Sequence, residues 1–155
     1  MKVAILYASM SGNTKLVSDI IEKELIRRGC IVSSVNLHSQ ESNLEELVAD
    51  TDILLIGSYT WGNGKLPARM RKFLSYHLKD NKTHFPMTFV FGTGETQWMH
   101  YCRAVDEIKY HLKRHSINVQ ELSLKIEQSP LNGQENKVLY YIDEIMKEID
   151  KFELK

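Results

Sequence analysis

Residues 3–14 read VAILYASMSGNT, an apolar run that turns within a few positions into a polar loop with one glycine. The run from Val3 to Tyr7 is continuously apolar, which is typical of a strand buried on both faces of a parallel sheet. From Asn13 to Arg28 the apolar residues recur at helical spacing, and Gly29 is placed to end that helix. The stretch therefore predicts a buried strand, a polar loop and the start of a helix.

The rest of the chain repeats this alternation. Further strands are predicted at 30–37, 53–57, 87–92 and 117–126. Further helices are predicted near 44–48, from a first turn that contains Pro67, at about 102–115 and at 139–152. Alternation without a repeat or a linker indicates one domain over residues 1–155, of the α/β class. We expect a doubly wound five-stranded parallel sheet of order 2-1-3-4-5 with helices on both faces. In that order, the loops at 9–14, 58–66 and 93–101 surround one crevice.

Composition narrows the possible functions. Hydrophobic residues make up 43% of the 155 positions and charged residues 26%, which is ordinary for a globular domain. Lysine plus arginine and aspartate plus glutamate both number 20, and this balance argues against a generalised nucleic-acid binder. Neither a signal peptide nor an apolar run of about 20 residues is evident. We expect a cytoplasmic monomer without a membrane segment, in which Cys30 and Cys102 are free thiols.

The loop SMSGNT, residues 9–14, has the groups needed to hold an anion. A helix N-terminus presents unpaired N–H groups and a partial positive charge. Ser9, Ser11 and Thr14 add hydroxyls, Asn13 adds an amide, and Gly12 allows close approach of the backbone. The pattern GxxxxGK[ST] is absent, a dinucleotide loop would need more glycines, and the cysteine and arginine of a phosphatase loop are missing. The loop can hold a phosphate but cannot transfer one; the alternative is a capped helix start without a ligand.

The other two loops carry aromatic residues beside glycines. Tyr59 and Trp61 lie in SYTWGNG (58–64), and Trp98 and Tyr101 lie in GTGETQWMHYC (92–102). Two flat side chains facing each other across a crevice would enclose a planar ring, and nearby backbone groups could recognise its polar edge. A phosphate at one end and an aromatic plane at the other describe a mononucleotide-like ligand.

The residues SMSGNT, GSYTWGNG and FGTGETQW, followed by Cys102 and Asp106, resemble the three FMN-binding loops of the flavodoxin family, of the short-chain type. The resemblance runs from Met1 to about Leu112. It implies an FMN-dependent low-potential electron carrier rather than an enzyme. Such a carrier passes single electrons from a flavodoxin or ferredoxin reductase to an acceptor redox enzyme. It needs no catalytic acid or base and no metal, because the cofactor carries the chemistry.

The resemblance also implies roles for individual residues. The 9–14 loop surrounds the FMN phosphate, with Thr60 nearby, while Trp61 and Trp98 flank the flavin ring. Trp98 stands where flavodoxins usually have tyrosine. The N–H groups of Glu95 and Cys102 and a carbonyl near His100 meet the pyrimidine edge. The Gly62–Asn63 peptide flips on reduction and stabilises the one-electron form. The implied cofactor-binding residues are Ser9, Met10, Ser11, Gly12, Asn13, Thr14, Tyr59, Thr60, Trp61, Gly62, Asn63, Gly64, Thr93, Gly94, Glu95, Trp98, His100, Tyr101 and Cys102.

The charge distribution departs from the family. Flavodoxins are typically strongly acidic, whereas this chain has no net charge and contains two basic stretches, KLPARMRK at 65–72 and KYHLKRH at 109–115. These are either solvated helix faces or a surface for an acidic partner. Fewer acids near the flavin also predict a less negative potential for the second electron.

Three alternatives remain open at this level. The first is a flavodoxin-like activator of a metalloenzyme such as manganese ribonucleotide reductase. The second is an FMN-dependent quinone reductase, and the third is a binding module without flavin.

Overall fold

A five-stranded parallel sheet organises the computed structural model, which describes all residues except 11, 40–43, 62–63, 96–100, 131 and 155. The strand order is β2-β1-β3-β4-β5, as the sequence predicted. The strands are β1 (Lys2–Ala8), β2 (Ile31–Asn36), β3 (Ile53–Tyr59), β4 (Met87–Gly94) and β5 (Val119–Glu127).

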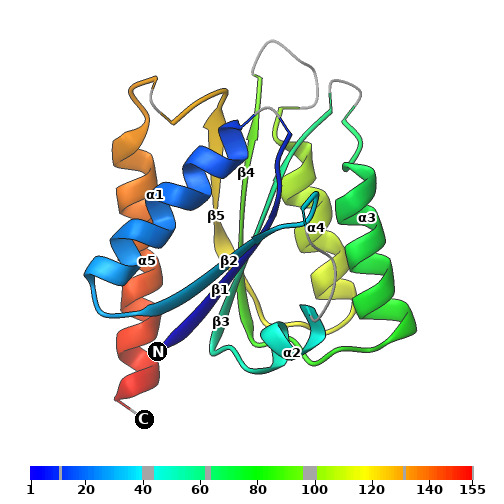
Figure 1. Cartoon of the computed structure of the whole chain (residues 1–155), viewed down its shortest axis with the longest axis horizontal. Helices are drawn as coiled ribbons and strands as arrows, with labels where there is room; N and C mark the ends of the chain where they lie inside the picture. The colour runs from blue at the N-terminus through cyan, green and yellow to red at the C-terminus, as the bar shows by residue number, and fades with distance from the viewer. Residues whose placement is uncertain (11, 40–43, 62–63, 96–100, 131, 155) are drawn as a thin grey trace.

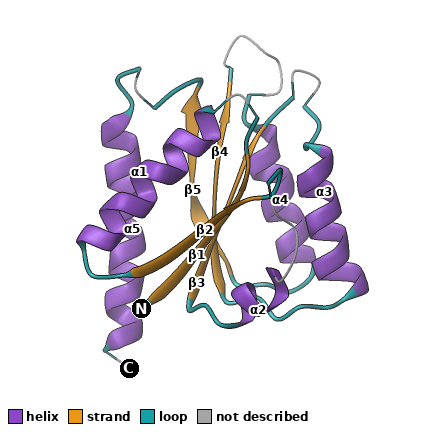
Figure 2. Cartoon of the chain, in the orientation of Figure 1, coloured by secondary structure: helices purple, strands orange, loops and turns teal. Residues whose placement is uncertain are grey.

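The helices lie in two layers, one on each face of the sheet (Figures 1 and 2). On one face are α1 (Asn13–Arg27) and α5 (Glu135–Glu153). On the other are α2 (Leu44–Ala49), α3 (Ala68–Leu74) and α4 (Arg103–Arg114). The π-helical turn η1 (Ser75–Asp80) continues directly from α3. The expected α/β fold with helices on both faces is confirmed.

The core is divided by the sheet into two apolar clusters. Along β1, Ala4 and Leu6 pack toward α3 and α4, while Ile5 and Tyr7 pack toward α1 and α5. A strand covered on both sides has no solvent-facing positions, which explains its continuous apolar sequence. Each fully buried large aliphatic side chain stabilises the fold by roughly 1.5–3 kcal/mol.

Several boundaries differ from the prediction. β3 and β4 each run two residues further than expected, so Tyr59 and Gly94 belong to strands. α5 begins at Glu135, four residues earlier, because exposed polar residues form its first turn before the apolar face starts at Val138. Pro67 precedes α3 instead of lying in its first turn; its ψ of 145° is extended, and its carbonyl accepts the N–H of Arg71.

Other expectations hold. Gly29 ends α1 with a φ of 96°, as the sequence predicted. Cys30 and Cys102 are both free and buried, and the sheet separates them because they lie in opposite clusters. Within the described part of the chain, no helix has both the length and the apolar character that crossing a membrane requires.

Candidate functional site

The three polar loops leave neighbouring strands at the same edge of the sheet. In the parallel register, Ala8 at the end of β1 pairs with Ser58 of β3, and Tyr59 of β3 pairs with Thr93 of β4. The chain segments that follow these strands therefore start side by side, at the top of Figure 1. Ligands of open parallel sheets bind at this carboxyl edge. The predicted meeting of the three strand ends at one edge is confirmed; that they surround a crevice stays a prediction.

The first loop is anchored from two directions. The hydroxyl of Ser9 accepts the N–H of Lys15 at 3.2 Å, across the start of α1. On the other side, the amide of Asn36 at the end of β2 accepts from the N–H of Ser9 at 3.3 Å and donates to its carbonyl at 3.2 Å. Asn36 was missed at the sequence level. The sequence signal that could have identified Asn36 is its position as a polar residue at the end of the strand expected beside β1.

The N-terminus of α1 has the character of an anion site. Gly12 is the residue before the helix, with a left-handed φ of 99°, and as a glycine it has no side chain to cap the turn, in which the Ser9 hydroxyl accepts the N–H of Lys15. The first turn contains no acidic residue that would compete with an anion. A side chain at Gly12 would be strained by the backbone, although the space around it is open. Backbone N–H groups at a helix start that follows a glycine suit a phosphate, so the donor set here fits the phosphate end of FMN.

Buried hydroxyls connect the first loop to the neighbouring strand ends. The Thr14 and Thr93 hydroxyl oxygens lie 2.8 Å apart, and both side chains are buried. The Thr60 hydroxyl accepts the N–H of Ala104 at 3.0 Å, and the Thr60 N–H donates to the carbonyl of Thr93. Thr60 thereby links the end of β3 to the start of α4.

The second loop closes on itself through backbone hydrogen bonds. The N–H of Gly64 donates to the carbonyl of Trp61 at 2.8 Å, and the N–H of Trp61 donates to the carbonyl of Lys65 at 3.3 Å. Gly64 has a φ of 81°, which favours glycine. The Trp61 side chain is 40% exposed, although tryptophan is usually well covered. An exposed ring beside this edge is suited to contact a planar ligand.

The third loop returns to the point where it began. A methyl group on Gly94 would lie 2.9 Å from the backbone nitrogen of Cys102, so only glycine allows this close approach. Cys102 has a left-handed φ of 49°, and its thiol points to the carbonyl of Ile126 at 3.7 Å. Burial raises the pKa of Cys102 to about 11 and also raises the pKa of Tyr101. Cys102 is therefore a structural thiol, and its contribution to a ligand would come from its backbone.

The predicted residues fall into two groups. The structure brings the segments around Ser9, Thr60, Thr93 and Cys102 to one edge through the contacts above. The remaining predicted residues, namely Ser11, Gly62, Asn63, Trp98 and His100, lie outside the described residues.

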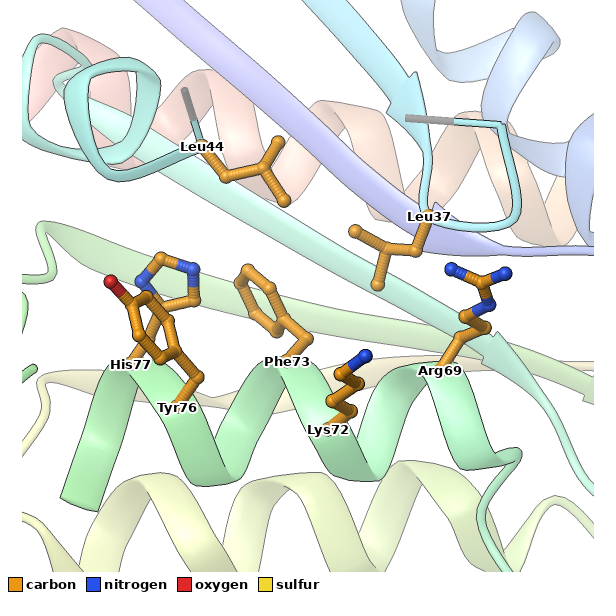
Figure 3. Close-up of a pocket in the computed structure, with 7 residues that line it drawn as sticks. All are labelled: Leu37, Leu44, Arg69, Lys72, Phe73, Tyr76 and His77. Atoms are coloured by element: carbon orange, nitrogen blue, oxygen red, sulfur yellow. The ribbon is translucent and has the colours of Figure 1, made fainter. Parts of the chain in front are cut away.

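A separate cavity of about 110 Å³ lies beside α3 and includes none of the predicted cofactor residues. Figure 3 shows the side chains of α3 and η1 facing two leucines across this hollow. The lining residues are Leu37, Leu44, Arg69, Lys72, Phe73, Tyr76 and His77. Two cations of the basic 65–72 stretch, Arg69 and Lys72, are thus placed on one flank of α3.

Comparison with known proteins identifies the family. The flavodoxin family model matches residues 5–140. The chain belongs to the flavodoxin family. Probable flavodoxin 2 of Bacillus subtilis is 29% identical over 140 residues, covering 90% of this chain and 91% of that protein. Probable flavodoxin 1 of the same organism is 32% identical over 129 residues, covering 83% of this chain and 79% of that protein.

The fold agrees with solved flavodoxin structures. Oxidised Flavodoxin 1 from Bacillus cereus has a TM-score of 0.83 and 25% identity to this chain, with coverage of 95% of this chain and 98% of that one. Membership of the flavodoxin family makes the protein an FMN-binding electron carrier and not an enzyme. The metalloenzyme activator, the quinone reductase and the flavin-free module are not needed to explain these findings.

Proposed function

We propose that the three loops at the carboxyl edge hold FMN, with its phosphate at the N-terminus of α1 and its ring between the second and third loops. The observation that carries this assignment is the first turn of α1, which follows a glycine, lacks acids and is bordered by the buried hydroxyls of Ser9 and Thr14. Bound FMN supplies the redox chemistry by accepting and releasing one electron at a time.

The phosphate site has no cation within the 9–14 loop, and Lys15, the next residue, pairs with Asp19 at 2.9 Å. Its donors are the N–H groups of the helix start and neutral hydroxyl and amide groups, which solvate an anion that is held but not transferred. A lysine in the loop would add positive charge near the flavin. Because dipoles hold the phosphate, the electrostatic potential at the flavin ring depends on charged groups farther away.

The ring assignment uses Trp61 and Trp98 as the two flanking side chains. The exposure of Trp61 and its position after β3 support this. The N–H groups of Glu95 and Cys102 then contact the pyrimidine edge, since the third loop ends where Cys102 packs against Gly94. The Gly62–Asn63 peptide retains its proposed role beside the ring.

The carrier works between two protein partners. An NADPH- or ferredoxin-linked reductase supplies electrons, and an acceptor redox enzyme receives them, each docking transiently at the exposed flavin edge. A single-domain monomer in the cytoplasm suits this role; its two buried thiols, neither in a disulfide, are consistent with that compartment.

A substitution at Thr14 tests the phosphate assignment. Thr14→Ala should raise the Kd for FMN by about tenfold and leave the Kd for riboflavin nearly unchanged, because riboflavin lacks the phosphate. Fluorescence titration of the FMN-free chain with each flavin gives both constants. Ser18→Ala is the matched control, since it removes another buried hydroxyl of α1 that is not among the predicted cofactor residues. Equal losses of FMN and riboflavin affinity in Thr14→Ala would reject the assignment.

Stepwise reduction tests the carrier role. The FMN-loaded protein, mixed with NADPH and a ferredoxin-type reductase, should be reduced through a one-electron stage visible as a long-wavelength absorption band. Without the reductase, NADPH should reduce it only very slowly. Rapid direct reduction by NADPH, followed by quinone turnover, would contradict the role.

A further inference from the structure

The two basic stretches of the sequence meet in one place. Arg71 from 65–72 and His111 and His115 from 109–115 line the same hollow, which has a volume of about 210 Å³. It lies between α3 and α4, which run side by side on one face of the sheet (Figure 1). Arg71 therefore faces away from the cavity of Figure 3, which Arg69 and Lys72 line. Segments about 40 residues apart in the chain thus form one surface.

A second hollow extends this surface toward the opposite end of the helices. It measures about 490 Å³, shares Leu78, Lys79 and His115 with the first, and adds Lys82 and Ile117. We call the two hollows together the α3–α4 groove. Its floor is apolar, formed by Leu74, Leu78 and Ile117, and its rim carries the cations Arg71, Lys79 and Lys82 together with His111 and His115.

The charge of the groove is not neutralised locally. Among the described residues, no acid lines either hollow, and Arg71, Lys79 and Lys82 are exposed and form no ion pair. Two acids lie close in sequence to the basic residues of the groove, Asp80 on η1 and Glu107 on α4. Of these, Glu107 lies 3.8 Å from the Nε2 of His111.

Some cations on the opposite face of the sheet have acidic partners on their own helix. On α1, Lys15 pairs with Asp19 at 2.9 Å, and on α5, Lys147 pairs with Glu144 at 2.8 Å. Helix α3, with the sequence ARMRKFL, has no acid with which to form such pairs. In a molecule with zero net charge, three exposed cations without an ion pair among the described residues, Arg71, Lys79 and Lys82, therefore lie around one apolar groove.

We propose that the α3–α4 groove docks an acidic, amphipathic segment of the carrier's protein partner. Carboxylates on the segment complement the cations of the rim, while its apolar side chains cover the leucine and isoleucine floor. The groove starts at Leu66, two residues after Gly64 of the second cofactor loop. A partner bound at the flavin edge can therefore extend a segment along α3. A nucleic acid would use the cations but not the floor, so the apolar lining favours a protein segment.

This docking role goes beyond the proposed function, because the groove includes none of the residues assigned to FMN. It rests on that function only in identifying the partner as a redox protein. The binding measurement below needs no electron transfer. A protein that is reduced normally by a reductase but does not bind the segment would overturn the docking role alone.

Peptide binding tests the inference directly on the FMN-loaded protein. The probe is a fluorescein-labelled peptide of alternating glutamate and leucine, and the comparison probe has serine in place of leucine. NMR amide shifts on the labelled protein should change over residues 66–82 and 107–117. The affinity should fall when NaCl rises from about 50 to 300 mM. The serine peptide should bind more weakly than the leucine peptide.

Charge reversal locates the site. Arg71→Glu with Lys79→Glu should weaken binding of the leucine peptide by about tenfold or more. The matched control is Lys23→Glu with Lys137→Glu, which changes the formal charge equally at exposed positions of α1 and α5, on the opposite layer. The control should bind as the unchanged protein does. FMN content and far-UV circular dichroism should be equal in both variants.

Four results would overturn the inference. These are no shift at the groove, equal weakening by the two charge-reversal pairs, equal binding of the serine and leucine peptides, and binding of an oligouridylate as tight as that of the leucine peptide.

Discussion

Gly57 lies directly under the aromatic ring of Phe91. The two residues are register partners on neighbouring strands β3 and β4, and a methyl group on Gly57 would overlap the ring. Phe91 is fully buried among the side chains that pack toward α1 and α5, so the ring has no free space to move into. The glycine thereby allows a large aromatic side chain to cover the end of the strand that leads to the second cofactor loop.

We therefore predict that Gly57→Ala destabilises the protein by about 1–3 kcal/mol, the usual range for overpacking a core. Urea unfolding followed by circular dichroism measures the change. Phe91→Leu in the same background should recover part of the loss, so the double variant should be less destabilised than the sum of the single variants. Strict additivity of the two effects would show that the overlap with the ring is not the cause.

The residue scale also shows what a sequence can and cannot reveal. The polarity of the first loop was readable from the sequence, because hydroxyls and glycine at a strand end have few other uses. Contacts between different segments of the chain were not readable from the sequence. The hydrogen bond of Asn36 to Ser9, the packing of Phe91 over Gly57 and the packing of Cys102 against Gly94 depend on strand register and on the path of the returning loop. Spacing within one segment carries no information about them.

At the scale of elements, hydrophobic periodicity predicted every strand and helix, and the errors are concentrated at their ends. The end of α3 is the clearest example, because the apolar pattern predicted a helix there but not its change into the π-helical turn η1. Within that turn, His77 is 4% exposed and its Nδ1 lies 2.8 Å from the hydroxyl of Thr83. The Thr83 oxygen also accepts from the amide of Asn81, so η1 is closed by a small polar network.

Burial lowers the pKa of His77, and it also lowers the pKa of His38, where Arg69 contributes. In the unfolded chain a histidine titrates near its ordinary pKa of about 6.5, so below that pH the unfolded state binds more protons than the folded one. The contribution of each histidine to stability is thus complete above about pH 6.5 and is lost as the pH falls toward the lowered folded pKa.

We predict that the free energy of unfolding of the FMN-free chain falls between pH 7.5 and 5.5, by at most about 1.4 kcal/mol per pH unit for each histidine. His77→Gln should make this fall shallower, and adding His38→Gln should reduce it further. Glu24, whose pKa is lowered to about 2 by Arg27 and Arg28, acts at lower pH and does not interfere. Urea titrations at the two pH values measure the slope, and an unchanged slope in His77→Gln would contradict the prediction.

At the scale of the whole molecule, the charge pattern matters more than the net charge. The balance of 20 basic and 20 acidic residues was visible in the sequence, but the meeting of two basic stretches between α3 and α4 was not. That meeting requires the folded arrangement of α3, η1 and α4 on one face of the sheet. Near the proposed flavin position, Glu95 is the one acid that the described parts of the three loops contribute.

The second electron adds negative charge at the flavin ring, so its potential depends on the charges around the loops. With few acids there, we expect a potential less negative than that of a strongly acidic flavodoxin. Lys65 lies near the end of the second loop, and its carbonyl accepts the N–H of Trp61, so it is well placed to act on the ring. Lys65→Glu should make the second potential more negative by roughly 20–70 mV, because it changes the charge beside the proposed ring position by two units.

A charge series separates this electrostatic effect from a structural disturbance. Lys65→Gln should give about half the shift of Lys65→Glu, and both shifts should shrink as ionic strength rises. Lys137→Glu, on α5 in the opposite layer, should leave the potential almost unchanged. Dithionite titration with reference dyes measures all four proteins. Equal shifts in the Gln and Glu variants would mean that the side chain acts through the conformation of the loop, because a charge effect must follow the number of charges removed.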